Sequence, residues 1–140
     1  METIEEYEHA GQGYNPFLIR RHWQVAQLNY APSLAFDAID RLERHKATDE
    51  VFILLRGRPV LIGAAEEAGV LRLERSAMRP GVTYNVPAGV WHAIAMRAED
   101  VVIIVENANT HLHDVEYRAL DETEFGKLIE LLHEETAPAR

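Results

Sequence analysis

Short stretches of alternating apolar and polar residues run along most of the chain, and Gly or Pro residues separate them at regular intervals. In a strand with one buried face, apolar side chains recur at every second position. Many short strands divided by turn residues are typical of an all-β sandwich or barrel. The pattern predicts strands at residues 23–30, 34–43, 50–56, 58–63, 70–75, 84–86, 91–97, 101–106 and 115–119.

The period changes near the C-terminus, where apolar residues recur at the i, i+3, i+4 and i+7 spacing of one helix face: Phe125, Leu128, Ile129 and Leu132. Asp121 and Glu124 lie just before this run, three residues apart as in a capping box, so we predict a helix at about 122–134. Its apolar face is expected to pack on its own domain, with a dimer contact as the alternative.

Length and composition indicate one globular domain spanning residues 1–140, with a barrel core at about 23–119. No Cys occurs, which excludes disulfides and thiolate metal sites and fits a reducing cytoplasm. The N-terminus is acidic and lacks the pattern of a signal peptide, and no apolar run reaches membrane-spanning length. We therefore expect a soluble cytoplasmic protein with no membrane partner.

The formal net charge of −9 comes from 23 acidic residues against 14 Lys and Arg residues. Nucleic-acid binding needs a basic surface, because neutralisation of phosphate supplies much of the affinity. The largest basic cluster is the pair Arg20 and Arg21. We therefore expect a small-molecule ligand and no nucleic-acid partner.

One segment combines a tight turn with a histidine that faces the core. Pro87 ends a strand, and Gly89 allows the positive φ that a sharp corner requires. His92 lies on the returning strand and has the same parity as Ile94, so its side chain should point toward the core.

A second segment places an acid on an apolar face. Glu50 begins a strongly apolar strand and shares its face with Phe52, while Gly57 ends the strand at a turn. Glu43 and His45 share a face of the preceding strand. A buried carboxylate is costly unless it is paired, protonated or bound to a metal, so Glu50 is a candidate functional group.

Together these residues resemble the two sequence motifs of the cupin superfamily. The second motif, Gly-x5-Pro-x-Gly-x2-His-x3-Asn, matches at Gly81, Pro87, Gly89 and His92. The first motif, Gly-x5-His-x-His-x3,4-Glu-x6-Gly, matches at His45, Glu50 and Gly57. The resemblance implies an all-β, cupin-type double-stranded β-helix (a jelly-roll barrel) followed by a C-terminal α-helix.

The first motif is degenerate. Glu43 replaces its first histidine, Asp37 replaces its opening glycine, and Met96 replaces the asparagine that ends the second motif. In metal-dependent cupins three histidines and the glutamate bind one divalent ion. The resemblance therefore implies a reduced metal site, with Glu43 as a fourth candidate beside the matched ligands His45, Glu50 and His92.

Two interpretations of this site stay open. A set of two histidines and one or two carboxylates suits Mn, Fe, Ni or Zn. Alternatively the barrel is metal-free, and Glu50 forms a hydrogen bond with His45 or His92. Glu50 and His92 are also the candidates for acid–base catalysis, because a semi-enclosed barrel shifts pKa values.

Other chemistry-bearing residues have simpler explanations. His111 and His113 form a second His-x-His, but they follow a polar stretch and are expected to be solvated loop residues. Arg56 has the parity of Glu50 and could meet an anionic substrate, although an arginine at a strand end is usually solvated. The chain contains no Gly-x-Ser-x-Gly nucleophile motif and no phosphate-binding Gly-rich loop.

Three functions follow from these patterns. The first is a metal-dependent lyase, isomerase or oxygenase acting on a small polar metabolite, since all three chemistries occur in cupins. The stretch Gly-Val-Trp-His at residues 89–92 also resembles the corresponding part of ureidoglycolate lyases. The second function is a metal-free ligand-binding or sensor protein without catalysis. The third is a structural homodimer with a filled barrel, and a homodimer is the oligomer expected of a cupin.

Overall fold

The computed structural model describes residues 3–134, which form ten strands and three short or medium helices. The strands are β1 (Gly13–Ile19), β2 (Trp23–Asn29), β3 (Arg41–Arg44), β4 (Glu50–Arg56), β5 (Val60–Glu67), β6 (Val70–Ala77), β7 (Thr83–Val86), β8 (Trp91–Ala95), β9 (Val101–Asn107) and β10 (Glu116–Ala119). The helices are the 3-10 turn η1 (Pro32–Leu34), α1 (Thr110–His113) and α2 (Glu122–Leu132).

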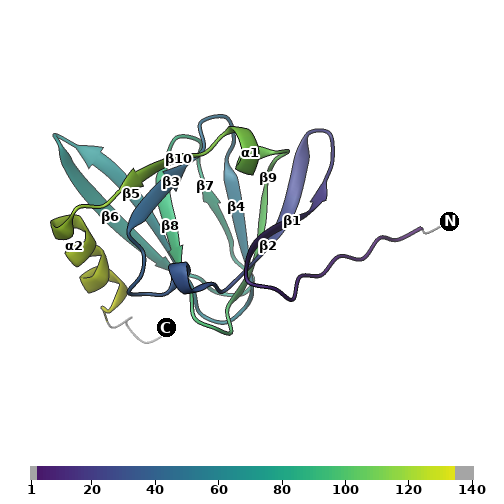
Figure 1. Cartoon of the computed structure of the whole chain (residues 1–140), viewed down its shortest axis with the longest axis horizontal. Helices are drawn as coiled ribbons and strands as arrows, with labels where there is room; N and C mark the ends of the chain where they lie inside the picture. The colour runs from purple at the N-terminus through teal and green to yellow at the C-terminus, as the bar shows by residue number, and fades with distance from the viewer. Residues whose placement is uncertain (1–2, 135–140) are drawn as a thin grey trace.

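The strands form two antiparallel sheets of five strands each, with orders β1-β2-β9-β4-β7 and β10-β3-β8-β5-β6. Most consecutive strands from β2 to β9 alternate between the two sheets, which is the winding of a jelly roll. Figure 1 shows the two sheets side by side with α2 at the outer side of the second. The all-β fold predicted from the sequence is confirmed.

The main core lies between the sheets and follows the predicted alternation of side chains. Phe52 and Leu54 of β4 pack there with Ile94 of β8 and Ile104 of β9. Because Glu50 has the parity of Phe52, its side chain is buried too, with 3% of the residue exposed. The same alternation therefore places Glu50 next to the apolar core between the sheets.

Helix α2 covers the outer face of the second sheet. Leu128 and Leu132 are buried against Val60 and Ile62 of β5. The predicted capping box is present, since the Asp121 side chain accepts the N–H of residue 124 and the Glu124 carboxylate accepts that of residue 121. The helix therefore packs on its own domain, as predicted, and ends at residue 132 rather than 134.

The strand predicted at 34–43 is wrong. The chain forms η1 and a turn there, and only residues 41–44 are extended. The alternation at these positions arises because Leu34 packs on the core between the sheets, whereas Phe36 and Ile39 pack toward α2. Pro32 begins the turn, where its fixed φ is favourable.

Strand β1 was not predicted, so the first sheet begins at Gly13 rather than near residue 23. Pro16 is unusual inside a strand, because proline cannot donate a hydrogen bond to a neighbouring strand. The structure accommodates it at a sheet edge, where the pairing of β1 with β2 shifts register between Asn15 and Leu18.

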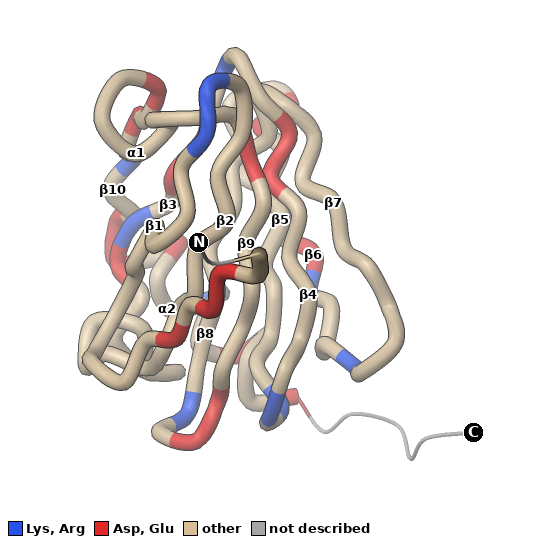
Figure 2. Tube along the Cα trace, turned by 90° about the vertical axis from the view of Figure 1, so that its right-hand side faces the viewer, with Lys and Arg blue, Asp and Glu red and all other residues tan. Residues whose placement is uncertain are grey.

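Charged residues are distributed along the chain without long basic segments. Lys and Arg positions appear as short separate segments among acidic and neutral ones in Figure 2. None of the helices in residues 3–134 is both long and apolar enough to cross a membrane.

Candidate metal centre

Backbone hydrogen bonds hold the two motif segments side by side. The N–H of Gly89, in the turn before β8, donates to the carbonyl oxygen of His45 over 2.7 Å. The Asp49 carboxylate accepts the N–H of Ala88 at 2.9 Å and the side-chain amide of Asn85 at 3.1 Å. The turn before β8 is therefore tied to the loop between β3 and β4.

Four side chains meet inside this end of the barrel: Glu43 of β3, His45 just after it, Glu50 of β4 and His92 of β8. One potential ligand atom of each lies within 4.8 Å of those of the other three. His45 Nε2 is 2.6 Å from Glu50 Oε2, and His92 Nε2 is 2.9 Å from the same oxygen. The structure thus brings together all four residues that the motifs singled out.

The outer nitrogen of each histidine is held by a backbone carbonyl oxygen. His45 Nδ1 donates to the carbonyl of Asp114 at 2.7 Å, and His92 Nδ1 donates to that of Val90 at 3.0 Å. Each Nδ1 is assigned the proton because a carbonyl oxygen can only accept. In the neutral ring Nε2 then directs a lone pair into the cluster, as in metal-bound histidines.

Glu50 carries the negative charge at the centre of the cluster. Burial raises its pKa, but hydrogen bonds from His45 and His92 outweigh burial, so the pKa of Glu50 lies below its usual value. Burial also opposes protonation of both histidines, yet the hydrogen bond and charge of Glu50 raise the pKa of His45 to about 9 and raise that of His92. In the metal-free protein, Glu50 therefore favours the protonated form of both flanking histidines.

Glu43 lies at the more open side of the cluster. It pairs with His92 in the register of β3 and β8, and its Oε1 is 3.7 Å from His92 Nε2. Its side chain is 38% exposed, in contrast to the 5% of Glu50. Partial burial and the nearby charge of Glu50 raise the pKa of Glu43. It is therefore the acid of the cluster that a ligand can reach most easily.

The sequence did not predict a third acid, Glu106, which lies beside this cluster. Its Oε1 accepts hydrogen bonds from the Tyr14 hydroxyl (2.6 Å) and the Gln24 amide (3.2 Å), and its Oε2 is 3.8 Å from His45 Nε2. Burial and the charge of Glu50 raise the pKa of Glu106. Glu106 has the same parity as Val102 and Ile104 on its strand, and this shared face is the signal that could have identified it as a buried acid.

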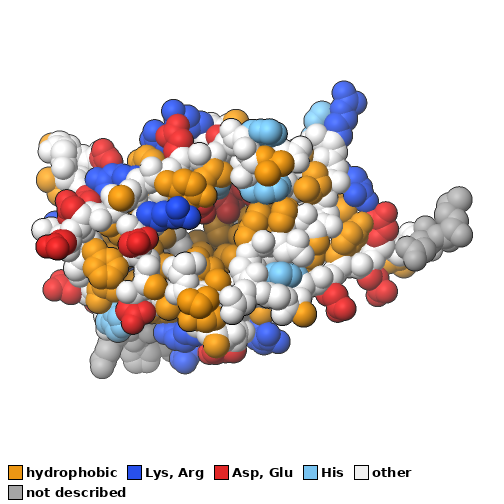
Figure 3. Space-filling view, viewed as in Figure 1, with side chains coloured by type: hydrophobic (Ala, Val, Ile, Leu, Met, Phe, Trp, Pro, Cys, Tyr) orange, Lys and Arg blue, Asp and Glu red, His pale blue; other side chains and the backbone are white. Residues whose placement is uncertain are grey.

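A cavity opens directly onto the cluster. Its volume is about 290 Å³, and its wall includes all four clustered residues together with Glu106 and Arg41. An adjoining cavity of about 440 Å³ shares Arg41, Glu43, His92 and Tyr117 with it. The face in Figure 3 is hollowed near its middle, with acidic side chains inside the hollow. The volumes suit a small metabolite, since ligand pockets usually measure about 300–1,000 Å³.

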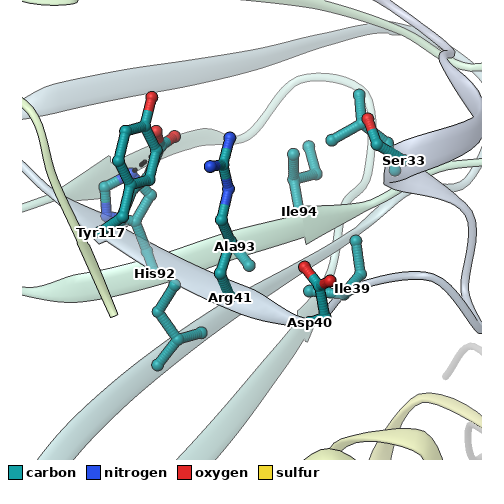
Figure 4. Close-up of a pocket in the computed structure, with 11 residues that line it drawn as sticks. Ser33, Ile39, Asp40, Arg41, His92, Ala93, Ile94 and Tyr117 are labelled. Atoms are coloured by element: carbon teal, nitrogen blue, oxygen red, sulfur yellow. Dashed lines mark ion pairs between the residues drawn. The ribbon is translucent and has the colours of Figure 1, made fainter. Parts of the chain in front are cut away.

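Arg41 is the cationic residue of this cavity wall. Its guanidinium lies 3.9 Å from the centre of the Tyr117 ring, and Figure 4 shows the two side chains next to each other. The parity of Arg56 with Glu50 makes Arg56 the anion-binding candidate of the sequence instead. Arg56 is exposed and donates to the carbonyl oxygen of Glu99, away from the cluster. Arg20 pairs with Glu5 and also lies outside the cavity wall.

The interpretation of His111 and His113 as solvated loop residues is only partly correct. They belong to the short helix α1, and His113 is exposed. His111 is half-buried, with Nδ1 at 3.2 Å from the Gln24 amide nitrogen. Neither histidine belongs to the four-residue cluster.

The four clustered side chains fit one divalent ion. A metal ion lies about 2.0–2.2 Å from nitrogen and carboxylate ligands, so donors separated by up to 4.8 Å need only small side-chain movements to share it. Both histidines are already oriented through Nδ1. The donor set, two imidazoles and two carboxylates, suits Mn, Fe, Ni or Zn.

The jelly-roll winding and the convergence of both motifs at one end of the barrel decide the fold. This is a cupin. No protein-family model matches the chain. Ureidoglycolate lyases of Pseudomonas putida and Pseudomonas entomophila are each 36% identical to it over 76 residues. The match covers 49% of this chain and 44% of each lyase, so the chain spans less than half of their length.

Solved structures with a similar fold include enzymes that act on small molecules. An oxalate oxidase in complex with the substrate analogue glycolate is 15% identical, covers 61% of this chain and 42% of its own, and has a TM-score of 0.47. A DMSP lyase from Ruegeria pomeroyi is 15% identical, covers 68% of this chain and 42% of its own, and has a TM-score of 0.44.

Proposed function

We propose that this cupin is a metal-dependent lyase that acts on a small 2-hydroxy acid of the ureidoglycolate type. The observation that carries the proposal is the meeting of His45, Glu50 and His92 at the wall of a cavity that also contains Arg41. The 36% identity to ureidoglycolate lyases narrows the chemistry from the lyase, isomerase and oxygenase classes to the first.

The proposed site separates metal binding from substrate binding. His45, Glu50 and His92 are the three buried residues of the cluster and would hold the ion. A divalent ion bound there supplies Lewis-acid polarisation of the substrate oxygens. Arg41 would bind the substrate carboxylate, for which a guanidinium is well matched in shape and charge.

Cleavage of ureidoglycolate breaks the bond between its carbinol carbon and a urea nitrogen. The hydroxyl loses a proton, a carbonyl forms, and the departing nitrogen gains a proton, which gives glyoxylate and urea. Glu43 is suited to accept and return this proton, because its carboxyl is half-exposed at the open side of the cluster and its pKa is raised. Glu50 and His92, the acid–base candidates from the sequence, could take that role only in a metal-free barrel, because here both would bind the ion.

The test is metal content and turnover of the same samples. Protein purified without an affinity tag or chelator is analysed by elemental mass spectrometry, and glyoxylate release from ureidoglycolate is measured. His92→Ala is compared with His22→Ala, a matched control at an exposed position outside the cluster. We expect about one metal equivalent and turnover in the wild type and in His22→Ala, and neither in His92→Ala.

Two results would overturn the proposal. A wild type that stays metal-free after incubation with Mn, Fe, Ni and Zn would remove the mechanism. Stoichiometric metal without glyoxylate release would retain the metal site but exclude this substrate.

The alternative is a metal-free ligand-binding or sensor protein. It is favoured by the hydrogen bonding inside the cluster, where Glu50 Oε2 already accepts from both His45 and His92. Such a protein would bind a small carboxylic acid in the same cavity without turnover. Its Glu50→Gln variant would retain ligand affinity, whereas in the enzyme this substitution would remove metal or activity.

A further inference from the structure

Glu106 presents one buried carboxylate oxygen that has no partner among the described residues. The residue is 6% exposed, and the hydrogen bonds from Tyr14 and Gln24 both reach Oε1. Oε2 is buried and receives no hydrogen bond within residues 3–134. A buried polar atom without a partner is costly, so such an atom in a native protein usually faces a ligand or an ordered water.

The nearest basic group does not satisfy this oxygen. His45 Nε2 is 3.8 Å from Glu106 Oε2, beyond hydrogen-bond distance, and is 2.6 Å from Glu50 Oε2. Its other nitrogen, Nδ1, is bound to the carbonyl oxygen of Asp114. The partner of Glu106 Oε2 must therefore come from elsewhere.

The orientation of this carboxylate is fixed by its neighbours. Gln24 lies opposite Glu106 in the register of β2 and β9, and its amide also donates to the Tyr14 hydroxyl at 2.9 Å. The Gln24 carbonyl oxygen accepts the N–H of Asn109 at 2.8 Å, which determines the direction of the amide. Both donors reach Oε1, which leaves Oε2 without a hydrogen-bond partner among the described residues.

Glu106 and Arg41 line the same cavity of about 290 Å³. Arg41 offers a cation, and Glu106 offers a free acceptor. A ligand that satisfies both groups needs an anionic group for Arg41 and a hydrogen-bond donor for Glu106.

We propose that Glu106 Oε2 accepts a hydrogen bond from an amide or ureido N–H of the ligand, so that the cavity selects small carboxylic acids carrying such a group. The assignment rests on the proposed function in placing the ligand beside the metal cluster. It adds a specificity-determining residue outside both cupin motifs, with Tyr14 and Gln24 as positioning residues.

Two probes of the same shape test the assignment without turnover. N-carbamoylglycine carries a carboxylate and a ureido group, whereas levulinate has carbon in place of both nitrogens. Dissociation constants for both are measured by calorimetry on the wild type and on Glu106→Gln, which keeps the size of the side chain and replaces one oxygen with a donor. Glu99→Gln, at an exposed position, is the matched control.

We expect the wild type and Glu99→Gln to prefer N-carbamoylglycine over levulinate by about 10- to 100-fold, the usual value of a hydrogen bond to a charged group. Glu106→Gln should lose at least tenfold of this preference, with levulinate affinity and metal content unchanged. Tyr14→Phe, which removes one donor from Oε1, should reduce the preference by a smaller factor. If Glu106→Gln does not fold, the preference measured for Tyr14→Phe still tests the assignment.

An unchanged preference in both variants would overturn the assignment, as would a wild type that binds neither probe. Loss of metal in Glu106→Gln would also overturn it, because Glu106 would then act as a metal ligand. Failure of the lyase proposal is distinguishable from all of these results. In that case ureidoglycolate is not cleaved, but the preference for N-carbamoylglycine still depends on Glu106.

Discussion

The buried His45–Glu50–His92 triad makes the stability of the metal-free protein depend on pH in a defined direction. The pKa of His45 is raised from 6.5 to about 9 in the folded protein. A raised histidine pKa contributes stability that is fully present below the unfolded value of about 6.5 and is lost as pH rises through the folded value. The metal-free protein should therefore lose stability between pH 6.5 and 9.

The size of this loss follows from the difference between the two pKa values. About 1.4 kcal/mol per pH unit over the interval from 6.5 to about 9 gives about 3 kcal/mol as an upper bound for His45. Glu50→Gln removes the charge that raises this pKa. Breaking a buried ion pair from one side costs about 3–5 kcal/mol, so the variant should be less stable than the wild type by about this amount at pH 6.

The two proteins should converge as pH rises, because the contribution of the charged pair to the stability of the wild type falls between pH 6.5 and 9, whereas Glu50→Gln has no such contribution to lose. The free energy of unfolding is measured by urea denaturation in the presence of EDTA at pH 6, 7.5 and 9. Glu99→Gln controls for the loss of an exposed acid. A difference between wild type and Glu50→Gln that is the same at pH 6 and pH 9 would refute the charged triad.

Two further substitutions test the supports of the fold and of the site. Gly57→Ala should destabilise the protein by more than about 3 kcal/mol in thermal melts, because φ of residue 57 is +97° and the new Cβ would lie 1.9 Å from Asp100 Oδ1. Gly81→Ala is the control: φ is also positive there, but the space around the residue is open, so this substitution should cost about 1 kcal/mol. Asp114→Ala should weaken metal binding by about 10- to 100-fold in calorimetric titrations, because both Asp114 carboxylate oxygens accept backbone N–H groups of the loop that carries His45. If the variant binds metal with wild-type affinity, the loop does not need this support.

The four-residue cluster could be predicted because its residues resemble the cupin motifs, and the side-chain parity and turn chemistry of those motifs are local. Glu50 shares its face with apolar residues of its own strand, and Gly89 follows Pro87 within one turn. Both facts hold even where the predicted arrangement of the strands is wrong. What brings Glu43 opposite His92 is the register of β3 and β8, which alternation alone does not determine.

Arg41 and Tyr14 could not be assigned by the same reasoning. Arg41 has the parity of Glu43 and His45, but parity alone does not show that its side chain lines the cavity. Tyr14 lies in β1, a strand that the sequence did not predict, and it reaches Glu106 across 92 positions of sequence. Contacts between such distant segments depend on the closed barrel. They are therefore visible only in three dimensions.

In both the metal-free and the metal-bound form, positive charge at His45 and His92 offsets the negative charge of the buried acids. In the metal-free protein the raised pKa values of His45 and His92 favour a proton on each Nε2, and positive charge there offsets the buried acids. A divalent ion bound to the same two nitrogens replaces both protons with an equal charge. Metal binding at pH 6.5 should therefore release about two protons, and affinity should rise by up to about 100-fold per pH unit below the histidine pKa values. Calorimetry in buffers of different ionisation enthalpy counts these protons, and a release of fewer than one would show that the histidines are neutral before the metal binds.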